Sequence, residues 1–148
     1  MEIHTDNIDD AALLAYRRIA EIYAHQADRG TAEAMAALFT EDAVLVSPDA
    51  TLQGGDAISR IPTMLRDMFA ATRHEILNQT IELRGDNEMS GETYCNALHL
   101  LHPDGDQPRQ LLGWSIRYQD KLRFTENTWK IARRELVLDW TEMRTVRP

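Results

Sequence analysis

The spacing of apolar residues changes from helical to alternating at Ala71, and this change most constrains the fold. Four long segments of strand character follow it, at residues 72–84, 88–101, 107–125 and 128–143. Groups of turn residues such as Gly85-Asp86-Asn87 separate them, and turn chemistry between β-rich runs predicts consecutive hairpins. Strands longer than the usual range of about three to ten residues have to twist and bend strongly. We therefore expect a curved, mostly antiparallel sheet.

The residues before Ala71 favour helices. Between residues 9 and 28 apolar side chains recur at steps of three and four, which predicts an amphipathic helix that Gly30 ends. Thr31 can cap a second, shorter helix that runs to Phe39. Two of the three expected helices are placed in this way.

A short β-rich run at residues 43–47 is expected to pair with residues 51–53. Gly54-Gly55-Asp56 then starts a third helix that extends to about residue 70, and Pro62 should kink or split it. Helices first and a strand meander second is an α+β arrangement. We expect three N-terminal helices to lie across the concave side of the sheet. Helices and sheet together would form a cone-shaped α+β barrel that encloses a pocket, as one domain over residues 1–148.

Charge and cysteine content exclude several classes of function. The formal net charge is −8 and no basic cluster stands out, so the chain is a poor match for nucleic acid or an anionic membrane. Cys95 is the only cysteine, which excludes an internal disulfide and favours a buried small hydrophobe over a nucleophile. Residues 1–10 carry four acids and no apolar run of signal-peptide length. A cytoplasmic protein is the simplest interpretation.

Two residues are candidates for chemistry. Asp28 lies near the end of the first helix, where the helix dipole disfavours an anion, although an exposed acid is the simpler interpretation from spacing alone. In an extended strand His74 shares one face with Ile76 and Asn78, so these side chains could point into a polar pocket or lie on the convex surface.

The later strands leave more than one interpretation open. One face carries Tyr94, Asn96 and Leu98 and the other Cys95, Ala97 and His99, and alternation does not decide which is the inner face. The same holds where Lys130, Ala132 and Arg134 alternate with Trp129, Ile131 and Arg133. Trp114 is most simply a core or interface aromatic. There is no phosphate-binding glycine loop and no metal-ligand spacing, so we expect no cofactor and no metal.

The chain resembles a known family. The order and spacing of its motifs are similar to those of SnoaL-like proteins of the nuclear-transport-factor-2-like superfamily, and the likeness covers nearly the whole chain. It is closest to the branch that includes scytalone dehydratase, hexachlorocyclohexane dehydrochlorinase and the bile-acid dehydratase. The segments that carry the resemblance are residues 22–30, 36–43, 54–58, 72–78, 117–122, 129–134 and 139–140.

The resemblance implies a site. Enzymes of that branch pair an aspartate of the first helix with a histidine of the first long strand, which carries over to Asp28 and His74. A pocket tyrosine five residues before the aspartate is matched by Tyr23. The resemblance also suggests a homo-oligomer, with a trimer favoured over a dimer. The candidates for contacting substrate are Asn78, Asn96, Trp114 and Arg134.

We therefore expect a cofactor-independent lyase or isomerase of the dehydratase type. Its Asp-His dyad would remove a proton from a small hydrophobic cyclic compound, such as a polyketide, steroid, terpenoid or aromatic. One alternative is a non-catalytic ligand-binding or assembly subunit, like the small subunit of ring-hydroxylating dioxygenases. Another is a cofactor-free hydrolase that uses the same pocket.

Overall fold

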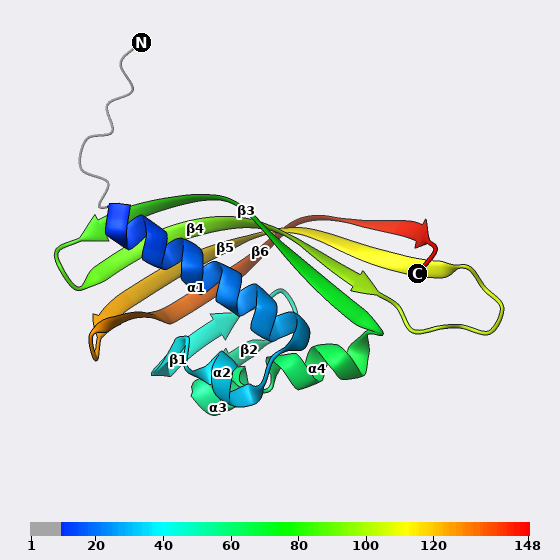
Figure 1. Cartoon of the computed structure of the whole chain (residues 1–148), viewed down its shortest axis with the longest axis horizontal. Helices are drawn as coiled ribbons and strands as arrows, with labels where there is room; N and C mark the ends of the chain where they lie inside the picture. Colours follow the sequence, from blue (N-terminus) through cyan, green and yellow to red (C-terminus); the bar gives the residue numbers. More distant parts are fainter. Residues whose placement is uncertain (1–9) are drawn as a thin grey trace, which may run out of the picture.

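The computed structural model describes residues 10–148 and shows helices packed on a single curved sheet (Figure 1). The expectations about the N-terminal acids and a signal sequence fall on residues 1–9, outside the described residues. No helix within residues 10–148 is long and apolar enough to cross a membrane.

The helices begin close to where the sequence predicts them, but the second ends at Ala36 instead of Phe39, because Phe39 is already the first residue of strand β1 (Phe39–Val46). The long helix α1 covers Asp10–Arg29 and α2 covers Ala32–Ala36, with the Thr31 hydroxyl accepting a hydrogen bond from the Ala34 amide at 3.2 Å. The third predicted helix is present as two, α3 at Gly55–Ile58 and α4 at Ile61–Met68. Pro62 stands in the first turn of α4, where its missing N–H costs nothing.

The strands form one sheet of six. They are β1 (Phe39–Val46), β2 (Thr51–Gln53), β3 (Ala71–Arg84), β4 (Glu88–Leu100), β5 (Arg109–Thr125) and β6 (Thr128–Val146). Their order is β2-β1-β6-β5-β4-β3, and β1 with β6 is its one parallel pair among the described residues. The α+β class and the mostly antiparallel sheet are thus confirmed. The sheet is open, with β2 and β3 at its two edges.

Helix α1 crosses one half of the sheet, and the far halves of β4, β5 and β6 extend beyond the helices (Figure 1). The residues of β4 that face α1 and the cavity are Thr93, Cys95, Ala97 and His99, and all four are buried. This is the concave face, and it settles the inner face that alternation leaves open. Cys95 is buried as expected.

Three β-bulges interrupt the alternation that the sequence suggests. On β3, Leu77 and Asn78 together stand opposite one residue of β4, and on β6 Ala132 and Asp139 are the extra residues. Because each bulge adds one residue, side chains beyond it change face. Simple alternation predicts that Asn78 shares the inner face with His74 and Ile76. In the structure Asn78 does not share that face and is exposed.

Candidate active site

A cavity of about 200 Å³ lies between the concave face of the sheet, α4 and the turn between β1 and β2. Its walls are largely apolar and include Leu52, Leu65, Ile116 and Leu136. Its polar groups gather on the sheet and α1 side, where Tyr23, His74, His99 and Tyr118 line it, and at the β1–β2 turn with Ser47 and Asp49. An apolar pocket with a few convergent polar groups is the usual form of a small-molecule site.

Asp28 and His74 form the predicted pair, in which His74 lines the cavity and Asp28 binds its ring from outside the lining. The His74 ring nitrogen Nδ1 lies 2.6 Å from Asp28 Oδ1, and the two side chains are only 7% and 14% exposed, respectively. The backbone amide of His74 donates to Asp28 Oδ2 at 2.9 Å, and the Thr72 hydroxyl donates to Oδ1 at 2.8 Å. One carboxylate at the end of α1 thus accepts three hydrogen bonds from β3.

These contacts fix the charge of Asp28 and the tautomer of His74. Burial by itself would raise the pKa of Asp28, but the hydrogen bonds and charge of His74, with the Thr72 hydroxyl, hold that pKa below its usual value. An ionised carboxylate only accepts, so His74 Nδ1 carries a proton and donates it. This arrangement leaves Nε2 as the ring nitrogen available to the cavity.

His99 completes the polar end of the cavity. Its ring centroid lies 6.2 Å from that of His74, and its Nδ1 lies 3.1 Å from the Leu112 carbonyl oxygen. The carbonyl can only accept, so Nδ1 donates and Nε2 is left as an acceptor. Burial lowers the pKa of His99, which favours the neutral ring. His99 was not among the predicted site residues. Thr72 shares a face of β3 with His74 and pairs with His99 of β4, so His99 lies on the same face of the sheet as His74.

Tyr23 lies in the cavity wall, and Arg134 lies behind it. The guanidinium carbon of Arg134 is 4.3 Å from the Tyr23 ring centroid and 4.1 Å from that of Tyr118. Arg134 is fully buried and binds Asp120 through two 2.8 Å hydrogen bonds, so it supports the tyrosines rather than lining the cavity. Burial raises the pKa of Tyr23 against the opposing charge of Arg134, which keeps the phenol protonated and able to donate.

The other predicted substrate contacts divide between the two faces of the sheet. Trp114 lines the cavity, with its ring centroid 5.6 Å from that of His99. Asn96 pairs with Ser115 on the convex face and lines a separate surface groove there. The structure therefore brings Asp28, His74, Tyr23 and Trp114 together and leaves Asn78 and Asn96 away from the cavity.

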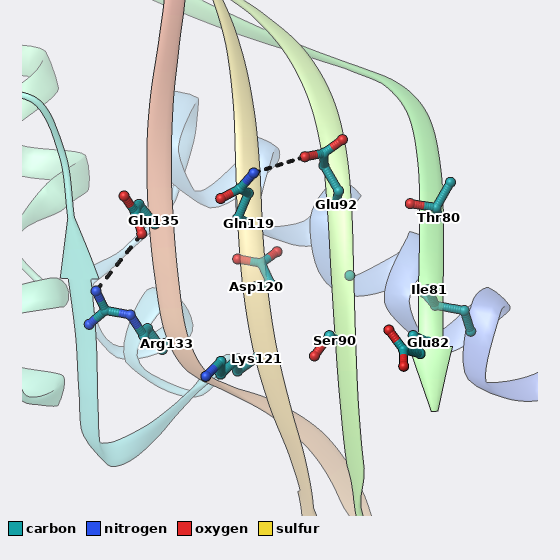
Figure 2. Close-up of a pocket in the computed structure, with 11 residues that line it drawn as sticks. Thr80, Ile81, Glu82, Ser90, Glu92, Gln119, Asp120, Lys121, Arg133 and Glu135 are labelled. Carbon is teal, nitrogen blue, oxygen red and sulfur yellow. Dashed lines mark hydrogen bonds and ion pairs between the residues drawn. The ribbon is translucent and has the colours of Figure 1, made fainter. Parts of the chain in front are cut away.

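A larger depression of about 480 Å³ lies on the convex face of the sheet (Figure 2). Its side chains are mostly charged or polar and pair with one another, as in Gln119 with Glu92 at 3.0 Å and Arg133 with Glu135 at 3.9 Å. Within residues 10–148 no group of three or more histidine, cysteine or acidic side chains is placed to hold a metal ion. The concave cavity is the better candidate because it joins an apolar lining with a paired histidine.

Solved structures of similar fold include two from Novosphingobium aromaticivorans. A candidate scytalone dehydratase is 25% identical (TM-score 0.78, covering 94% of this chain and 91% of that one). A candidate aromatic ring hydroxylase is 20% identical (TM-score 0.79, coverage 95% and 96%). A hexachlorocyclohexane dehydrochlorinase, LinA type 2, is 17% identical (TM-score 0.80, coverage 93% and 94%).

No curated protein sequence matches the chain. A family model does match it, over residues 11–135. That span runs from the start of α1 into β6, and it contains Asp28 together with the cavity-lining residues Tyr23, His74 and His99. The chain belongs to the SnoaL-like domain family.

Proposed function

We propose that this protein is a lyase or isomerase of the dehydratase type, in which His74 is the base and Asp28 its partner. The observation that carries the proposal is the 2.6 Å contact between His74 Nδ1 and Asp28 Oδ1 at the wall of an apolar cavity. A carboxylate on one ring nitrogen fixes the tautomer and stabilises the imidazolium that forms when the other nitrogen accepts a proton.

The reaction needs only side chains of this cavity. His74 Nε2 removes a proton from a carbon next to a carbonyl, and the C–H electron pair forms the new double bond as the neighbouring C–O bond breaks. The phenol of Tyr23 gives its proton to the departing oxygen, which leaves as water. The imidazolium then returns a proton to Tyr23, so the enzyme ends as it began. Without a leaving group, return of the proton to a different carbon gives isomerisation.

The cavity limits the size of the substrate. A cavity of roughly 150 Å³ is known to hold one benzene molecule. The cavity here measures about 200 Å³ and therefore suits a compound of one or two rings better than a four-ring steroid. Its Leu, Ile and Met lining favours a neutral, largely apolar ligand. The neutral ring of His99 offers an acceptor, which suits a substrate hydroxyl.

A panel of one- and two-ring β-hydroxy ketones tests this proposal, because loss of water gives a conjugated ketone that absorbs in the ultraviolet. We expect His74→Gln and Asp28→Asn each to lower kcat by about 10²- to 10⁴-fold, the usual range for general acid–base catalysis. Far-ultraviolet circular dichroism would check that both variants keep the fold.

Matched controls come from exposed residues of the same type. His25→Gln on α1 and Asp86→Asn in the β3–β4 turn should leave kcat unchanged. Full turnover by His74→Gln would contradict the proposal. If no compound of the panel reacts but one- and two-ring ketones still bind in the cavity, the ligand-binding alternative is favoured instead.

A further inference from the structure

We propose that Arg17 is a positioning residue for the Asp28–His74 pair, because it fixes the location of the β3 bulge that turns His74 into the cavity. This inference rests on the proposed function of the pair. Arg17 lies on α1, the helix that also carries Asp28. It does not line the cavity, and its contacts outside α1 are with the backbone of β3, which is the route by which we expect it to affect the chemistry.

The bulge decides which side chains of β3 face inward. Residues 71–76 pair with residues 100–95 of β4, and residues 79–84 pair with residues 93–88, so two residues of β3 stand opposite Tyr94. His74 faces the cavity before the bulge, and Gln79 donates to the inward Thr93 hydroxyl at 2.9 Å after it. Five positions separate His74 from Gln79, and strict alternation would put them on opposite faces.

Arg17 binds the backbone at the bulge itself. Its Nη1 donates to the Leu77 carbonyl at 2.6 Å and its Nη2 donates to the Ile76 carbonyl at 3.2 Å, while its Nε donates to Glu21 at 2.7 Å. Carbonyl groups of successive residues point to opposite edges of a regular strand. Here the carbonyl groups of Ile76 and Leu77 both turn toward α1. The Arg17 guanidinium, whose donors form a fixed fork, binds both carbonyl oxygens.

Helix α1 therefore holds β3 at two points. Asp28 accepts from Thr72 and His74 before the bulge, and Arg17 donates to Ile76 and Leu77 at the bulge. Because β3 is an edge strand, the backbone groups of His74, Ile76 and Leu77 can bind α1 on the side without a neighbouring strand. A bulge that moved past His74 would turn its ring to the convex face, since a shift of one residue exchanges the faces. Arg17 makes the present location the favoured one.

Nuclear magnetic resonance of labelled histidines tests this without any substrate. The Nδ1 proton shared between His74 and Asp28 should give a downfield signal that Asp28→Asn removes. We expect Arg17→Met, which keeps the apolar stem but removes the donors, to weaken or split this signal. Arg17→Lys should largely restore it, because an ammonium group can donate to both carbonyls. With a substrate, Arg17→Met should lower kcat by about 10- to 100-fold and change KM less.

Arg123→Met is the matched control, because it breaks a comparable exposed ion pair with Asp42 at 3.2 Å, and Arg123 pairs with Glu88, six positions along β4 from the residue opposite the bulge. It should leave the His74 signal intact. An unchanged signal in Arg17→Met would overturn the positioning role and leave the proposed function standing. Full turnover by His74→Gln would instead overturn the proposed function, while the effect of Arg17 on the signal remained. If Arg17→Met does not fold, Arg17→Gln, which keeps one amide donor group, should show partial loss of the signal.

Discussion

At the scale of single residues, the burial of His99 has a consequence for stability. Burial lowers the pKa of His99 from an ordinary value of 6.5, so below about pH 6.5 the unfolded chain binds a proton that the folded chain does not. The free energy of unfolding should therefore fall as the pH drops from about 6.5 to the lowered pKa, by at most about 1.4 kcal/mol per pH unit from this residue.

Urea denaturation between pH 5 and pH 7.5 measures this effect. We expect His99→Gln to show a smaller loss of stability on acidification than the unsubstituted protein, because its amide does not titrate and can still donate to Leu112. The exposed His25 provides the control, and His25→Gln should keep the full pH dependence. Identical pH dependence in all three proteins would show that His99 does not contribute.

The contact between Asp28 and His74 could be predicted because the motifs around these residues resemble those of enzymes that pair an aspartate with a histidine. Spacing alone favoured the opposite interpretation for Asp28, an exposed acid at an unfavourable helix end. What offsets the dipole is a set of hydrogen bonds from β3, and these join residues 44 and 46 positions apart in the chain. Contacts over such separations have no periodic signature in one sequence.

At the scale of elements, the Tyr16 side chain of α1 lies so close to the backbone of β4 that Gly91 has no room for a Cβ atom. A Cβ atom added at Gly91 would lie 2.5 Å from two carbons of the Tyr16 ring. Tyr16 is fully buried and donates to Asp120 at 2.8 Å, so the ring cannot move without losing a buried hydrogen bond. We expect Gly91→Ala to lower the free energy of unfolding by about 1–3 kcal/mol, the usual cost of overpacking.

Chemical denaturation followed by tryptophan fluorescence measures this cost. Gly55→Ala is the matched control, because a Cβ there meets no atom within 4 Å and the position is the first residue of α3. Alanine should be neutral or slightly stabilising in a helix. Equal denaturation midpoints for the two variants would contradict the close contact between Tyr16 and Gly91.

The order of the elements and most of their bounds were predictable, but the end of α2, the start of β1 and the bulges were not. Helix caps, Pro62 and the glycine and asparagine turns have local chemistry that can be read from the sequence. A bulge depends instead on how the neighbouring strand pairs. The extra residues at Leu77–Asn78 and Ala132 reverse the alternation, and they explain why Asn78 and Arg134 do not lie where strict alternation puts them.

At the scale of the whole molecule, part of the sheet extends beyond the helices that cover the rest (Figure 1). Residues 139–145 of β6 are all exposed, on both faces of the strand. Trp140, 65% exposed, pairs with Ser115 on the convex face, and Met143, 55% exposed, pairs with Leu112 on the other. Large apolar side chains exposed on both faces of a strand are typical of a protein interface.

We therefore expect this end of the sheet to be covered by further copies of the chain. Light scattering at micromolar concentration should give a mass of about three times the 16.9 kDa of one chain, with the trimer favoured over the dimer. Trp140→Arg and Met143→Arg each place a charge in the apolar contact and should shift the mass toward that of one chain. Leu14→Arg on the outer side of α1, where Leu14 is 62% exposed, should leave the mass unchanged. A mass of 16.9 kDa for the unsubstituted protein would contradict self-association. If Leu14→Arg lowered the measured mass as much as Trp140→Arg does, the interface would instead lie on the helical side.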